Sequence, residues 1–79
     1  MIIKTIKNLL KKKLSPHIIH VTGNSNHINI FIVSDIFHNM KELKRQQIIY
    51  EPLTPYIQNK TLHAISIKTY SLQEYKQHN

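Results

Sequence analysis

The chain has 79 residues and a mass of 9.4 kDa, which supports one hydrophobic core of modest size. Its formal net charge is +7, from 11 basic and 4 acidic residues, and it carries six histidines. Because it contains no cysteine, the sequence excludes a disulfide scaffold, a thiolate nucleophile, a zinc-finger module and any metal site held by the chain's own sulfur.

An amphipathic helix of about 13 residues is predicted at the amino end. Apolar residues recur there at spacings of three and four, and lysines occupy most of the other side. The helix ends at Ser15-Pro16, because proline disfavours a helical conformation in the residue before it. The apolar stripe consists of Ile2, Ile3, Ile6, Leu9, Leu10 and Leu14.

A β-hairpin is predicted next. Residues 17–22 and 27–34 are rich in β-branched side chains, and isoleucines alternate along the second run. Residues 23–26 between them are glycine, asparagine and serine, which is a turn composition. Two strands joined by a short polar turn favour antiparallel pairing.

A connection and a second helix follow the hairpin. Asn39 is the residue of the 35–39 connection best suited to a left-handed turn. Residues 40–53 have helical periodicity, with Pro52 and Pro55 expected to break the helix and Thr54 to cap a further short turn. The predicted inward stripe is Leu43, Gln46, Ile49, Tyr50 and Leu53, and the predicted outward face is Lys41, Lys44 and Arg45.

A third strand over residues 62–69 and a short last helix complete the chain. Ser71 and Glu74 have the spacing of a capping box, in which each side chain bonds the other's backbone N–H. The order α-β-β-α-β-α predicts an α+β fold. We expect a three-stranded mixed sheet packed against helices, in a single domain over residues 1–79.

Signatures of catalysis are missing from the sequence. A single glycine excludes a glycine-rich phosphate loop, and neither a nucleophile elbow nor a His-Glu-x-x-His helix is present. The acidic residues are too scattered to predict an acid–base pair. We therefore expect a protein that is not an enzyme. The four acidic residues are Asp35, Glu42, Glu51 and Glu74.

Histidine is the most informative residue type in this chain. A lone histidine is usually an exposed or rim residue, but His63 precedes an Ala-Ile-Ser-Ile run at the mouth of the third strand. If the hairpin lies beside this strand, the turn that holds His27 lies near His63. Two imidazoles without a thiolate form an incomplete metal site, which needs ligands from another molecule.

The second candidate site is the basic helix face formed by Lys41, Lys44 and Arg45. Their spacing puts them on one side of a helix, which is sufficient for phosphate contact, although a solvated helix face is the commoner role for such a pattern. The sequence indicates no aromatic pair on an exposed sheet for base stacking. The tyrosines at positions 50, 56, 70 and 75 are expected in the core and at its rim.

The positive charge is weaker evidence for a nucleic-acid partner than its size suggests, because the composition of the chain is biased. Ten of the 11 basic residues are lysine, and isoleucine, lysine and asparagine together make up 31 of the 79 residues. This bias is typical of an AT-rich genome, so part of the charge reflects composition rather than a nucleic-acid partner. Apolar runs fall far short of the roughly 20 residues that span a bilayer. We expect no membrane partner and a cytoplasmic location.

Several segments along the chain are distinctive in combination. They are residues 14–16, 27–34, 37, 44–53, 62–68 and 70–75. With these segments the chain resembles the BolA family over essentially its whole length, and within it the short IbaG (YrbA-like) branch of bacterial proteins associated with acid stress. The closing Tyr-Ser-Leu-Gln-Glu-Tyr is similar to the family's Thr-Pro-x-Glu-Trp ending.

The resemblance implies a fold similar to class II KH domains and a role in iron–sulfur cluster trafficking. BolA proteins pair with monothiol glutaredoxins, and the two proteins share a [2Fe–2S] cluster. The glutaredoxin supplies its cysteine and a glutathione thiolate. The BolA partner supplies the histidine of a strand-opening His-Ala motif, here His63, and a second histidine or cysteine from the hairpin loop. The resemblance leaves a homodimer open as another assembly.

The chain departs from the family pattern at three places. Phe37-His38-Asn39 stands where the family has Phe-x-Gly, and asparagine accepts the same left-handed backbone. Residues 23–26 hold neither histidine nor cysteine, so His27 is the nearest candidate for the second ligand. The family's Arg-His-Arg stretch is Arg-Gln-Gln here, at residues 45–47, as in the IbaG branch.

Two functional hypotheses follow. The first is a non-enzymatic adaptor in iron–sulfur trafficking that shares a cluster with a monothiol glutaredoxin through His63 and His27, with a link to acid stress. The alternative is a KH-like, nucleic-acid-binding transcriptional regulator that uses Lys41, Lys44 and Arg45.

Overall fold

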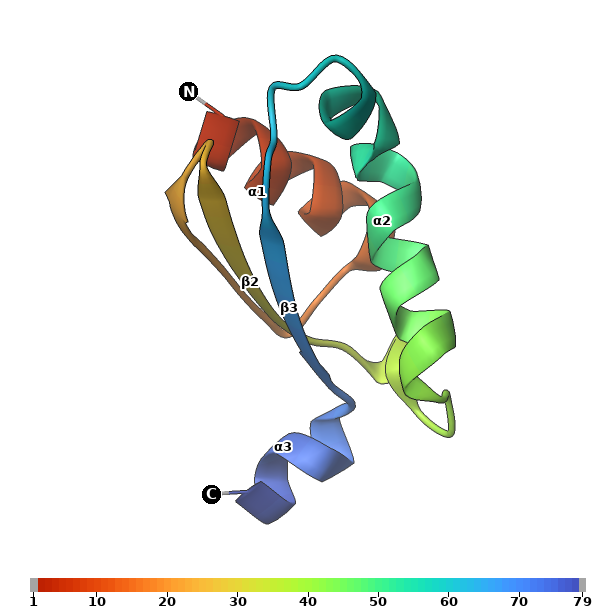
Figure 1. Cartoon of the computed structure of the whole chain (residues 1–79). Helices are drawn as coiled ribbons and strands as arrows, with labels where there is room; N and C mark the ends of the chain where they lie inside the picture. Colours follow the sequence, from red (N-terminus) through yellow and green to blue (C-terminus); the bar gives the residue numbers. More distant parts are fainter. Residues whose placement is uncertain (1, 79) are drawn as a thin grey trace.

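The computed structural model describes residues 2–78, and Figure 1 shows their arrangement. The predicted order of helices and strands is confirmed, with one short 3₁₀ helix, η1, added between β2 and α2. The elements are α1 (Ile2–Leu14), β1 (Ile18–Asn24), β2 (His27–Val33), η1 (Asp35–Phe37), α2 (Glu42–Gln58), β3 (Ile65–Tyr70) and α3 (Leu72–His78).

The three strands form one mixed sheet in the order β1-β2-β3. β1 and β2 pair antiparallel, and β2 and β3 pair parallel because α2 carries the chain back to the starting end of β2. Helices α1 and α2 lie on the same side of the sheet, and α3 lies beyond the end of β3 (Figure 1). The opposite face of the sheet therefore stays open over most of its length.

The core lies between the sheet and the two longer helices. Helix α1 contributes Ile6, Leu10 and Leu14, which confirms the predicted stripe. The central strand contributes Ile28, Ile30 and Ile32, each at most 2% exposed. Alternation along β2 thus sends its isoleucines into the core and His27, Asn29 and Phe31 to the open face.

Helix α2 differs from the prediction in length and orientation. It runs unbroken through Pro52 and Pro55, so the expected break and the Thr54 cap are wrong. Thr54 Oγ1 instead donates to the carbonyl of Tyr50 at 3.0 Å inside the helix. Pro52 and Pro55 each remove one backbone hydrogen bond from the helix, because proline has no N–H. The helix continues because Ile49 and Leu53, both fully buried, pack it against the core.

The predicted inward stripe of α2 is partly wrong. Leu43 is 71% exposed and Tyr50 36% exposed, whereas the buried positions are Arg45, Ile49 and Leu53. Their spacing of four places them on one face. In the first turn of α2 the buried residue is therefore Arg45.

The ends of β3 also differ from the prediction. The strand begins at Ile65 rather than Leu62, and Leu62 is buried in the loop before it. The capping box at α3 is confirmed: Ser71 N–H donates to Glu74 Oε1 at 2.7 Å, and Glu74 N–H donates to Ser71 Oγ at 3.2 Å.

Within residues 2–78, no helix is both long enough and apolar enough to cross a membrane.

Candidate metal-ligating site

The β1–β2 turn and the segment before β3 lie side by side at one end of the sheet. His63 N–H donates to the carbonyl of Ser25 at 3.1 Å, and Ile28 N–H donates to the carbonyl of Ala64 at 2.9 Å. These two bonds extend the parallel pairing past the start of β3. The structure therefore brings the backbones of His63 and His27 to the same end of the sheet, and both residues are exposed.

The turn is tighter than the sequence predicted, because Gly23 and Asn24 belong to β1 and only Ser25 and Asn26 connect the strands. Asn24 Oδ1 accepts from the backbone N–H groups of Asn26 at 2.9 Å and His27 at 3.3 Å. Gly23 has a φ of +103°, and a Cβ there would lie 2.1 Å from the carbonyl oxygen of His27. The chain's one glycine thus fixes the backbone at His27.

The His27 ring is oriented by a neighbouring strand. Its Nε2 atom lies 2.8 Å from Oγ of Ser66 in a hydrogen bond. When Nε2 carries the proton and donates to Ser66, Nδ1 keeps its lone pair for a metal ion. Ser66 therefore orients the His27 ring, a contact that the sequence did not predict. The sequence feature that points to Ser66 is its place on the third strand, two residues beyond Ala64.

The remaining histidines with described side chains lie elsewhere. His17 Nε2 is 3.0 Å from Asp35 Oδ2, and His38 follows η1 at the opposite end of the sheet. His20 packs against Phe31 on the open face. The described residues hold no group of three or more His, Cys, Asp or Glu side chains that could bind a metal ion.

The donor set at this end of the sheet fits a shared cluster in its chemistry. Rieske-type [2Fe–2S] centres use two imidazoles on one iron and two thiolates on the other. His63 and His27 would be the imidazole donors of such a cluster, and because the chain has no cysteine, both thiolates would have to come from another molecule.

The predicted basic helix face is only partly present. Lys41 and Lys44 are exposed, but the prediction for Arg45 is wrong, because Arg45 is 6% exposed. The reason is that its guanidinium finds acceptors in three other segments of the chain, which compensates for its burial. The exposed face is therefore reduced to two lysines.

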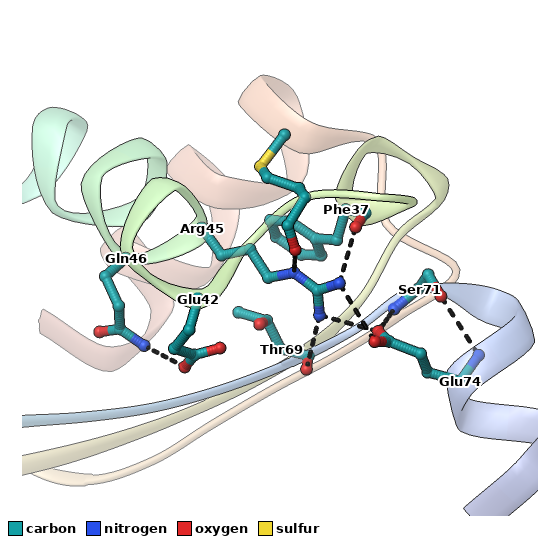
Figure 2. Close-up of polar contacts among 8 residues, drawn as sticks. Phe37, Glu42, Arg45, Gln46, Thr69, Ser71 and Glu74 are labelled. Carbon is teal, nitrogen blue, oxygen red and sulfur yellow. Dashed lines mark hydrogen bonds and ion pairs between the residues drawn. The ribbon is translucent and has the colours of Figure 1, made fainter.

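Arg45 instead links η1, α2, β3 and α3 (Figure 2). Its Nε donates to the carbonyl of Met40 at 2.7 Å, and Nη2 donates to the carbonyl of Phe37 at 2.8 Å. Nη1 donates to the carbonyl of Thr69 at 3.4 Å. The two Nη atoms also bond both carboxylate oxygens of Glu74, at 2.8 and 3.2 Å.

The Arg45–Glu74 pair changes the acidity of the carboxyl group. The hydrogen bond from Arg45, followed by the one from the Ser71 backbone, lowers the pKa of Glu74 from 4.5 to about 2. One feature of the sequence points to this structural role of Arg45. Arg45 is the sole arginine among 11 basic residues, and only arginine offers a planar fork of five donors.

The expectation that the sheet exposes no aromatic pair is wrong. Phe31 lies 5.9 Å from His20, 5.5 Å from Tyr70 and 6.1 Å from Tyr75, measured between ring centroids. These four rings form a cluster centred on Phe31 on the open face, which we call the aromatic ledge. The strand register brings His20 opposite Phe31, and α3 brings Tyr75 back over the end of the sheet.

The family model described as "BolA-like protein" matches residues 9–74. The chain belongs to the BolA family.

Relatives of this BolA chain match it along most of its length. A Buchnera aphidicola subsp. Baizongia pistaciae protein is 71% identical over 75 residues, which is 95% of each chain. The "Acid stress protein IbaG" of Escherichia coli K12 is 37% identical over 70 residues, covering 89% of this chain and 83% of the relative. The solved "BolA domain of SufE1 from Arabidopsis thaliana" superposes with a TM-score of 0.84 at 30% identity, over 91% of this chain and 93% of that domain.

Proposed function

We propose that this BolA protein is a non-enzymatic adaptor in iron–sulfur cluster trafficking. It forms a heterodimer with a monothiol glutaredoxin, and the two chains hold a [2Fe–2S] cluster between them. His63 is the first ligand from this chain and His27 the second. The observation that carries the proposal is that the backbones of two exposed histidines, distant in sequence, lie at the same end of the sheet.

The backbone around both histidines supports this role. The His63 N–H bond to Ser25 and the Asn24 side-chain bonds to the turn hold the two segments together before any partner binds. A fixed backbone lowers the entropy that is lost when a ligand or partner is bound. Exposure of both side chains leaves them accessible to a second protein.

The absence of cysteine supports a partner that brings thiolate ligands. A cluster needs thiolate ligands, so the partner must bring two of them, as a glutaredoxin with its own cysteine and a bound glutathione does. A [2Fe–2S] cluster with imidazole ligands supplies a one-electron centre of higher reduction potential than one held by thiolates alone.

Imidazole ligation also accounts for a link to acid stress, which the printed name of the Escherichia coli relative carries. A histidine binds a metal only through a ring nitrogen that carries no proton, so protons compete with iron for this ligand. We expect His63 and His27 to release the shared cluster more readily in acid than thiolate ligands alone would.

Reconstitution with a monothiol glutaredoxin, iron, sulfide and glutathione tests the proposal. Visible circular dichroism should show a spectrum distinct from that of glutaredoxin alone, and His63→Ala should abolish the difference. His38→Ala is the matched control, because His38 is exposed at the opposite end of the sheet. A spectrum equal to that of glutaredoxin alone, or equal losses from both variants, contradicts the proposal.

The second candidate is a nucleic-acid-binding regulator that uses the basic helix face. Exposure of Lys41 and Lys44 favours it, although Arg45 no longer contributes. Phosphate contacts by these lysines predict duplex-DNA affinity that falls steeply with salt and drops on Lys44→Ala. Affinity no better than that of an unrelated protein of equal charge refutes this candidate.

A further inference from the structure

The open face of the sheet carries a surface that lies largely outside the candidate cluster site and the basic helix face, with Ser66 at its border with the cluster site. A hollow of about 210 Å³ lies on it at the middle of the three strands. Two rows of facing residues line the hollow, one polar and one aromatic and basic. The first row is Thr22, Asn29 and Ser66, and the second is His20, Phe31 and Lys68.

We propose that this open face binds single-stranded nucleic acid, with bases stacked on the aromatic ledge and the backbone phosphates held by Lys68. The inference goes beyond the cluster-sharing function, and the side chains that carry it, Phe31 and Lys68, take no part in the cluster site. It concerns the protein without its glutaredoxin partner.

The aromatic ledge supplies the stacking surface. Phe31 is half-buried, with His20 on one side and Tyr70 on the other, tilted by 38° and 44° from its plane. Contacts with these neighbours hold the Phe31 ring in place before a base arrives. Stacking on aromatic rings is the main sequence-tolerant contribution to single-strand binding.

The polar side chains around the ledge match the other parts of a nucleotide. Asn29 has both a carbonyl and an amide group, and Thr22 and Ser66 have hydroxyl groups, so the polar row can pair with base edges or sugar hydroxyls. Lys68 lies directly beside Phe31 in the register and is exposed. A phosphate next to a stacked base would therefore find a cation within the same row.

Charge favours a polyanion over a second copy of the chain. None of the four acidic residues lies on β1, β2 or β3, so the face carries basic and neutral side chains alone. A symmetric dimer through this face would bring the Lys68 ammonium groups of both copies into one small interface, which places like charges close together. A single-stranded nucleic acid has both negatively charged phosphates, which complement Lys68, and planar bases, which can stack on the aromatic ledge.

The test uses a fluorescein-labelled 12-nucleotide single strand of mixed sequence and anisotropy titrations at several salt concentrations. Phe31→Leu should weaken binding at least about fivefold. Lys68→Gln should lower the slope of log affinity against log salt by about 0.7. Lys60→Gln, in the exposed turn after α2, should leave both quantities unchanged. Equal effects from Lys60→Gln and Lys68→Gln overturn the proposal.

A second variant guards against misfolding of Phe31→Leu. The chain has no tryptophan, so Phe31→Trp places a single fluorescent reporter in the ledge. The oligonucleotide should quench its emission saturably. Heparin, which has charge without bases, and an acidic peptide should not. Quenching by heparin or by the peptide equal to that by the oligonucleotide, or no binding of the single strand at all, refutes base stacking at this face.

Discussion

The link between Arg45 and Glu74 gives the sharpest prediction for stability. Glu74→Gln removes the charge of the carboxylate while keeping an acceptor oxygen for the Ser71 N–H, so the capping box stays formed. The bidentate bond to the Arg45 guanidinium becomes a weaker, neutral one. The variant therefore isolates the charge component of the link.

The magnitude follows from the lowered acidity. A pKa of about 2 in place of 4.5 corresponds to about 3 kcal/mol at most. Because 43% of the Glu74 side chain is exposed, solvent screens the pair, and we expect Glu74→Gln to cost about 1–2 kcal/mol of unfolding free energy at pH 7. Glu51→Gln, an exposed carboxylate on α2, should change it by less than about 0.5 kcal/mol.

The pH dependence has a definite sign. The pKa of Glu74 is depressed on folding, so its contribution is complete above pH 4.5 and is lost as the pH falls from 4.5 towards 2. Urea unfolding followed by far-ultraviolet circular dichroism measures this directly. The gap between the wild type and Glu74→Gln should be constant from pH 7 to 5 and close below pH 4.5. A gap that persists unchanged at pH 2.5, or no gap at pH 7, refutes this reasoning.

Three further predictions concern other parts of the structure. Gly23→Ala should lower the unfolding free energy by more than about 1 kcal/mol, because its Cβ would meet the His27 carbonyl; an unchanged melting temperature contradicts the turn geometry. Ser66→Ala should weaken cluster retention by about tenfold or more without loss of fold, since it releases the His27 ring; retention equal to wild type removes Ser66 as a positioning residue. Within residues 2–78, the buried Thr69 hydroxyl has no hydrogen-bond partner, so Thr69→Val should stabilise the protein by about 1 kcal/mol in a urea titration, and a loss of stability would show that the hydroxyl is satisfied.

Sequence patterns predicted the fold well where local periodicity and burial agree. The α1 stripe, the hairpin and the Ser71–Glu74 capping box each depend on neighbours within a few residues. The prediction for helix α2 was wrong, because tertiary contacts outweighed the local preference of proline to end a helix. Burial of Ile49 and Leu53 carried the helix past two prolines.

The orientation of α2 shows a second limit. Residue type alone favours Leu43 inside and Arg45 outside, yet the structure reverses them. The acceptors that make Arg45 acceptable in the interior belong to η1, β3 and α3, up to 29 residues away along the chain. No local pattern contains that information.

The candidate site was partly predictable for a topological reason. A parallel β3 beside β2 must start at the same end as β2, which brings residues 63 and 27 together. The bond between His27 and Ser66 and the aromatic ledge require the register of the strands, which alternation alone does not determine.

The most direct test of the central claim is whether imidazole nitrogen from this chain ligates the shared cluster. The chain would be labelled with ¹⁵N-histidine, reconstituted with unlabelled glutaredoxin, and reduced for pulsed electron paramagnetic resonance. We predict strong ¹⁵N coupling that His63→Ala weakens or abolishes and that His38→Ala leaves unchanged. A cluster with no histidine nitrogen coupling, held by sulfur alone, contradicts the proposed role of this BolA protein.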